Sequence, residues 1–172
     1  MDRRLGQRVI VGAVAGAVGT AAMDLLLYRR YRRSEGSDPL WQWESAAGVT
    51  SWDQASAPGQ MGRKLQRLAT RREPADRWAR ATTNIVHWAT GIGWGAQYGA
   101  VTGLTTRLPL LTAASLGPVA WLSGYVVLPL AGVYEPIWRY DARTLADDLT
   151  AHLVYGAATC AAFLVLSCRS QG

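Results

Sequence analysis

The sequence predicts an all-α, polytopic membrane protein: a bundle of four transmembrane helices with one short amphipathic helix at the membrane surface. The apolar residues gather in four runs that are nearly free of charge. Each run has about the 20 residues that a helix rising 1.5 Å per residue needs to cross a ~30 Å hydrocarbon core. Residues 1–172 are therefore expected to form a single membrane domain with spans at 9–28, 82–103, 110–133 and 148–168 and a long loop at 29–81.

The first run could be a retained helix or a cleaved secretory signal. It follows the basic start MDRRLGQR and contains the small residues Ala21 and Ala22, as a cleavage site does. The apolar run continues beyond that site through residues 25–27. This continuation favours a retained helix.

The long loop contains the predicted surface helix, at residues 61–70 (MGRKLQRLAT). Three apolar residues share one side of this helix and three basic residues lie elsewhere, which is typical of a helix lying on a membrane. The apolar residues are Met61, Leu65 and Leu68, and the basic residues, expected to contact anionic lipid headgroups, are Arg63, Lys64 and Arg67.

Prolines and capping residues mark the later helices. Pro118 and Pro129 each remove a backbone donor inside the third span, which predicts kinks or a broken helix. The last helix is expected to begin near Asp141 or Thr144, because Thr144 and Asp147 resemble a capping box.

The distribution of basic residues predicts the orientation. Of the 18 basic residues, 5 lie on the side of the two termini and 13 on the side of the long loop. The positive-inside rule therefore places the long loop and the turn at 134–147 in the cytoplasm. Arginine flanks the spans and forms no stripe on a soluble module, so nucleic acid is not a predicted partner. A composition rich in Arg, Ala and Gly suggests a GC-rich bacterial genome and hence a multi-pass protein of the bacterial plasma (inner) membrane.

Three ionisable residues inside the spans form a candidate polar cluster: Asp24, His87 and His152. Such residues cost roughly 2.5–3.5 kcal/mol at the centre of an inserted helix, so each is a candidate for function. Alternating topology places all three in one leaflet, about 6–8 Å below the boundary on the long-loop side at 1.5 Å per residue. They are expected to converge there.

Each of these residues heads a row of small residues spaced by four, as in a glycine zipper. Such rows let membrane helices approach closely, so the three polar side chains are expected to point into the bundle. The predicted helix-packing residues are Gly12, Gly16, Gly91, Gly95, Gly99 and Gly156.

The polar cluster is compatible with three chemistries. A proton-linked site would use histidine with Asp24 as its charge partner. A metal site could add Glu44, Asp53 or Glu135 from the loops, and two histidines could also hold a haem, so metal and cofactor stay unassigned. The sequence has no zinc-protease, nucleophile-elbow, phosphate-loop or paired-cysteine motif, which disfavours an enzyme.

The second half of the chain carries three family-like segments: NIVHWATGIGWGAQYG, VVLPLAGVYEPIW and LTAHLVYGAATCAAF. Through them, residues 82–168 resemble the YagU-like family of functionally uncharacterised bacterial inner-membrane proteins. The resemblance implies a polytopic inner-membrane fold and supports both histidines as family features, with no reaction or ligand attached. The loop around Glu44 and Asp53 does not follow the family pattern. The positions that carry the resemblance are His87, Pro129, Pro136 and His152.

Three functions follow as hypotheses. The first is proton-linked or small-solute permeation through the polar cluster, in a homo-oligomer because four short spans are few for a pathway. The second is an accessory or structural subunit whose glycine faces bind a partner membrane protein. The third is a metal- or haem-binding membrane protein.

Overall fold

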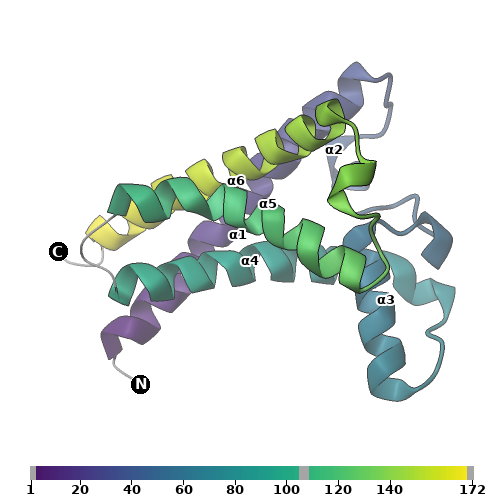
Figure 1. Cartoon of the computed structure of the whole chain (residues 1–172), viewed down its shortest axis with the longest axis horizontal. Helices are drawn as coiled ribbons and strands as arrows, with labels where there is room; N and C mark the ends of the chain where they lie inside the picture. Colours follow the sequence, from purple (N-terminus) through teal and green to yellow (C-terminus); the bar gives the residue numbers. More distant parts are fainter. Residues whose placement is uncertain (1–2, 105–108, 170–172) are drawn as a thin grey trace. The chain divides into compact units, whose positions relative to one another are not determined.

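The computed structural model describes residues 3–104 and 109–169, and the regular secondary structure of these residues is helix, with no strand. The all-α prediction is confirmed for this part of the chain. Its elements are α1 (Arg3–Arg33), α2 (Leu40–Glu44), η1 (Trp52–Gln54), α3 (Ala57–Thr70), η2 (Asp76–Trp78), α4 (Ala79–Leu104), α5 (Pro109–Leu130), η3 (Ile137–Arg139) and α6 (Ala142–Arg169), where η marks a 3-10 helix. Figure 1 follows them along the chain.

Two of the described helices are long and apolar enough to cross a membrane. They are α1, over Arg4–Arg33, and α6, over Ala142–Cys168. The sequence predicts four such helices, so the prediction holds for two of them by these criteria. In α4 the mean hydropathy is lowered by the threonines, the glycines, His87 and Gln97. In α5 the described apolar part, Ala114–Leu130, is shorter.

Two helix boundaries differ from the sequence predictions. The surface helix begins at Ala57 instead of Met61, because Pro58 occupies its first turn, where a missing backbone N–H costs nothing. Helix α5 continues without a break through Pro118 and ends at Leu130, directly after Pro129. The expected turn between the second and third spans includes residues 105–108, which lie outside the described residues.

The cap of α6 also differs from the prediction. Asp141 precedes the helix, and its Oδ1 accepts a hydrogen bond from the backbone N–H of Thr144 at 2.9 Å. Its Oδ2 accepts a second bond from the Thr144 hydroxyl at 2.7 Å. The predicted capping box of Thr144 and Asp147 is therefore wrong: Asp141 is the N-cap, and Thr144 is its partner in the first turn.

The chain divides into two compact units. The first unit comprises Met1–Leu27, Thr90–Ser123 and Asp141–Gly172, and the second comprises Tyr28–Ala89 and Gly124–Tyr140. The core of the first unit contains Ala15, Tyr98, Leu116, Tyr155, Cys160 and Phe163. The core of the second unit is smaller and consists of Trp52, Ala55 and Ala79, with Val49 packed against it.

Long helices of the first unit expose large apolar side chains. Ile10 on α1 is 66% exposed and Leu164 on α6 is 60% exposed. Others on these helices are Val14, Val18, Leu25, Val119, Leu122, Leu153 and Val165.

Candidate functional site

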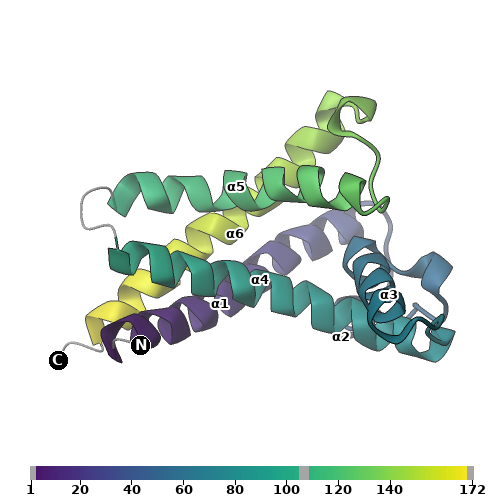
Figure 2. The same cartoon turned by 60° about the horizontal axis from the view of Figure 1, so that its bottom comes forward.

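Helices α1 and α4 cross in the first unit (Figures 1 and 2), and glycines lie where they meet. A Cβ added to Gly16 would lie 2.6 Å from the Gly91 carbonyl oxygen and 2.9 Å from Gly95 Cα. A Cβ on Gly95 would lie 2.5 Å from Gly16 Cα. Gly12 and Gly99 have similar backbone contacts across the same interface. The two backbones therefore touch directly over two turns of each helix.

Helix α6 contacts α5 and α1 in the same way. A Cβ on Gly156 would lie 2.7 Å from the Gly117 backbone nitrogen, and one on Gly117 would lie 2.5 Å from the His152 carbonyl oxygen. On α1, a Cβ on Gly19 would lie 2.7 Å from the Tyr155 carbonyl oxygen. The rows derived from the sequence do not include Gly117 or Gly19, because neither lies at a spacing of four from a polar residue.

A tyrosine hydroxyl joins α6 to α4 within the first unit. The Tyr155 side chain is 3% exposed, and its hydroxyl donates a hydrogen bond of 2.6 Å to the Gly91 carbonyl oxygen. In the same core, Tyr98 and Phe163 pack edge to face, with ring centroids 5.3 Å apart. Gly91 thus contacts Thr20 of α1 and accepts a hydrogen bond from Tyr155 of α6.

Asp24 lies on the packed face of α1. The residue is 4% exposed and follows Thr20, which is 1% exposed, by one helical turn. The Thr20 hydroxyl donates 2.9 Å to the Gly16 carbonyl oxygen and stands against Gly91. An acid is therefore buried on the helix face where the small residues lie.

His152 is partly buried on α6 and forms a pair with Asp148, one turn earlier. Its Nδ1–H donates to the Asp148 carbonyl oxygen at 2.9 Å and lies 3.4 Å from the Asp148 carboxylate Oδ1. The His152 side chain is 25% exposed. Asp24 and His152 both belong to the first unit, and their meeting stays a prediction.

His87 belongs to the second unit and is half-buried on α4. Its ring meets the ring of Trp88 edge to face at 6.3 Å. The Trp88 indole N–H donates 3.1 Å to Glu44 Oε1 on α2. Glu44, which the sequence predicts as a possible metal ligand from the loop, thus accepts a hydrogen bond from the residue next to His87.

The other two loop acids lie apart from this contact. Asp53 is exposed on η1. The backbone N–H of Glu135 donates to the Tyr140 hydroxyl at 3.2 Å. Within the described residues, no group of three or more His, Cys, Asp or Glu side chains is placed to hold a metal ion.

Helix α3 packs on α4 through its small side, in the second unit. A Cβ on Gly62 would lie 2.9 Å from Val86 Cγ2, and one on Gly59 would overlap the Thr83 hydroxyl. Gln66 Nε2 donates to the Thr82 hydroxyl at 2.8 Å. The glycine side of α3 is therefore its buried side, and the leucines face away from α4: Leu65 is 55% exposed and Leu68 is 78% exposed.

An open cavity of about 710 Å³ lies on the exposed side of α3 and reaches Ala131, just after α5. Lys64 lines it together with Met61, Leu65 and Leu68, three and four residues apart along the helix. The sequence prediction that placed Lys64 away from the apolar side is therefore wrong. The remaining lining residues are Arg67, Arg71, Arg72 and Glu73.

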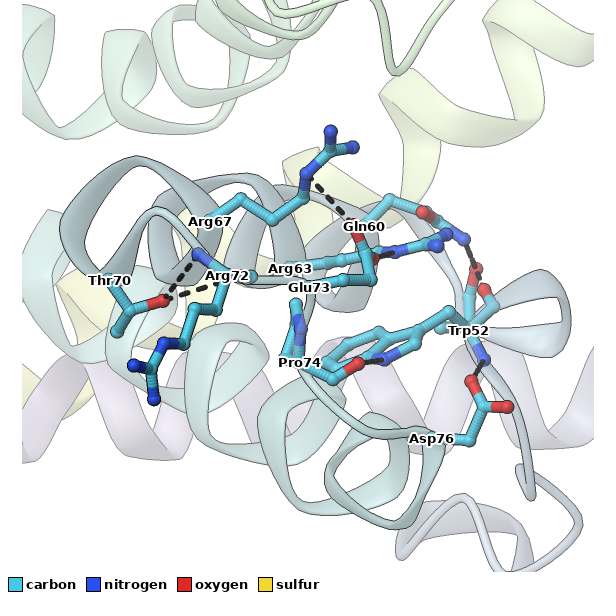
Figure 3. A network of polar contacts seen from close by, with 10 residues as sticks. Trp52, Gln60, Arg63, Arg67, Thr70, Arg72, Glu73, Pro74 and Asp76 are labelled. Carbon is cyan, nitrogen blue, oxygen red and sulfur yellow. Dashed lines mark hydrogen bonds and ion pairs between the residues drawn. The ribbon is translucent and has the colours of Figure 1, made fainter.

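One carboxylate neutralises two of the basic residues of α3. Glu73 Oε1 lies 2.6 Å from Arg63 Nε, and its Oε2 lies 2.9 Å from Arg67 Nε (Figure 3). The Arg63 guanidinium also lies 5.8 Å from the centroid of the Trp52 ring. Arg63, predicted to contact lipid headgroups, thus has protein partners on both sides.

Trp52 joins the two ends of the α3 segment. Its indole N–H donates 2.7 Å to the Pro74 carbonyl oxygen, and its backbone N–H donates 3.2 Å to Asp76 Oδ1. Its carbonyl oxygen accepts a bond from Gln60 Nε2. Figure 3 shows these bonds around the indole, which is 2% exposed.

Three charged residues that follow α3 and line the cavity are absent from the residues predicted from the sequence. They are Arg71, Arg72 and Glu73, directly after the helix, and three adjacent charges have no helical periodicity that would assign them to a face. Their position immediately after an amphipathic helix is the one sequence feature that could have indicated them. No protein-family model, curated protein or solved structure matches the chain.

Proposed function

We propose that this chain is an integral protein of the bacterial inner membrane with four spans. We propose that it acts in proton-linked or small-solute permeation as a homo-oligomer, with Asp24 as the protonatable group. The loops of the second unit face the cytoplasm in this proposal. The resemblance of residues 82–168 to the YagU-like proteins supports this proposal.

The exposed apolar helices support membrane insertion. In lipid, the side chains of α1, α5 and α6 that now face outward would be solvated by acyl chains, which are as apolar as leucine. Helices α4 and α5, with 26 and 22 residues, are long enough for the two further spans. Both meet an apolar helix through glycines, so their backbones need little side-chain bulk to pack.

The observation that carries the proton-linked role is the burial of Asp24, which is 4% exposed. A carboxylate inside a membrane span is costly, and its usual uses are proton relays and ion or substrate pathways. Asp24 lies one turn after Thr20 on the packed face of α1, where both residues are buried.

Proton flux into liposomes tests this role. The purified full chain would be reconstituted with an internal pH dye, and a potassium diffusion potential would drive protons inward. We expect the wild type to acidify the lumen faster than empty liposomes, and Asp24→Asn to return the rate to that of empty liposomes. The matched control is Asp53→Asn, which makes the same change at an exposed site and should leave the rate unchanged.

Equal rates for the wild type and Asp24→Asn, with both proteins folded by circular dichroism, would refute the proton-linked role. The accessory-subunit alternative would then gain support if purification in mild detergent brought down a stable membrane partner.

A further inference from the structure

We propose that the cavity on α3 binds one anionic phospholipid. Its phosphate would lie against Lys64, Arg71 and Arg72, and an acyl chain would lie along Leu65 and Leu68. The inference rests on the membrane location in the proposed function and adds a specific site to it.

The charges around the cavity favour an anion. Its lining holds four basic residues and the single carboxylate of Glu73. That carboxylate is already shared by Arg63 and Arg67, and Figure 3 shows the Arg72 guanidinium pointing away from it. Within the described part of the chain, no ion pair joins Lys64, Arg71 or Arg72 to a carboxylate. Guanidinium and ammonium groups placed together are typical of phosphate sites.

The backbone at Arg71 supports a role for its side chain. Arg71 ends α3 in the left-handed conformation, with φ 56° and ψ 22°, and its N–H donates 2.8 Å to the Arg67 carbonyl oxygen. Glycine is the residue that this position favours, because a Cβ raises the energy of the left-handed conformation. Arg71 adopts this conformation despite its Cβ, and its charged side chain lines the cavity.

The apolar lining separates a lipid from a soluble anion. Leu65 and Leu68 are 55% and 78% exposed, and both line the same cavity as the basic residues. A free phosphate would neutralise the cations and leave both leucines in water. A phospholipid satisfies both parts, because its headgroup and acyl chains are joined. A volume of about 710 Å³ is in the range of ligand pockets.

Lys64 is held where a headgroup can reach it. A Cβ on Gly132 would lie 3.6 Å from Lys64 Nζ, so the ammonium lies over the turn that ends α5. The partial negative charge of a helix C-terminus favours a cation at this place. The ammonium is thus positioned before any lipid binds.

Native mass spectrometry of the full chain in detergent tests the site. The protein would be delipidated and titrated with phosphatidylglycerol, phosphatidylcholine or inorganic phosphate. We expect one phosphatidylglycerol to bind in preference to phosphatidylcholine, and inorganic phosphate not to displace it. The double variant Arg71→Gly, Arg72→Gln should bind it about thirtyfold more weakly, from about 1 kcal/mol per basic residue at an anionic surface and tenfold per 1.4 kcal/mol.

The control variant Arg29→Gln, Arg33→Gln removes the same charge from exposed positions of α1 and should keep the preference. Equal binding of the two lipids, an equal loss in the control, or full displacement by inorganic phosphate would overturn the proposal. Arg71→Gly relieves backbone strain, so the double variant should fold. Leu65→Ser, Leu68→Ser provides a second test, and an unchanged affinity in it would overturn the place assigned to the acyl chain. Asp24→Asn should bind the lipid normally, so loss of proton flux and loss of lipid binding are separate results.

Discussion

Replacement of Gly95 by alanine should separate α1 from α4. The added Cβ would lie 2.5 Å from Gly16 Cα and 2.7 Å from Gly16 N. Because carbon atoms pack at about 3.5–4.0 Å, the helices must move apart by about 1 Å. The atoms that it meets are backbone, which no side-chain rotation can remove, so the cost should reach the upper part of the roughly 1–3 kcal/mol range for overpacking. Alanine returns about 1 kcal/mol of helix propensity. We therefore expect a net loss of about 2 kcal/mol.

Gly93 provides the matched control on the same helix, because a Cβ there meets nothing within 4 Å. Gly93→Ala should gain about 1 kcal/mol from helix propensity alone, so the two variants should differ by about 3 kcal/mol. Unfolding by sodium dodecyl sulfate in mixed micelles, followed by far-UV circular dichroism, measures the difference. If Gly95→Ala unfolds at the same detergent fraction as Gly93→Ala, the close contact of the two backbones is refuted.

Two further predictions concern single side chains. Hydrogen bonds from the Thr144 hydroxyl and backbone N–H lower the pKa of Asp141 from its ordinary value of 3.8. The ionised Asp141 carboxylate therefore stabilises α6 at pH values above 3.8. This stabilisation is lost as the pH falls through the lower pKa that Asp141 has in the folded protein. Thermal unfolding of Asp141→Asn should be less sensitive to pH below about 4 than that of the wild type, and identical profiles would contradict the cap. Cys168 is exposed and Cys160 is buried, so a membrane-impermeant maleimide added to intact spheroplasts should label Cys168 alone; labelling only after lysis would reverse the proposed orientation.

The all-helical class follows from the sequence because four apolar runs permit little else. The number of helices that are apolar enough to cross a membrane does not follow from the sequence in the same way. Helix α4 is long, but it contains glycine and polar residues whose role becomes visible only in the packing of the fold. Spacing places small residues in rows, yet it cannot assign the partners. The contact of Gly156 with Gly117 depends on how α5 and α6 cross, which no local pattern encodes.

The candidate sites divide in the same way. Ionisable residues inside apolar runs are visible in the sequence, as Asp24 is, and the burial of that residue is a property of the fold. On α3, helical periodicity identifies the two exposed leucines. It could not identify glycine as the buried side, since Gly59 and Gly62 carry no apolar side chain and matter only because Thr83 and Val86 lie against them. Arg63 and Arg67 likewise look free until Glu73 folds back onto them.

The bonds of Trp52 make the α3 segment a closed ring. The chain leaves at Trp52 and returns at Pro74, 22 residues later, to within hydrogen-bonding distance of the same indole. One indole thus closes the base of the loop that carries the basic residues of α3, so the residues before α3 and the residues that lead into α4 are tied to the same side chain. Loss of the Trp52 indole should therefore loosen the basic cavity and the start of α4 together.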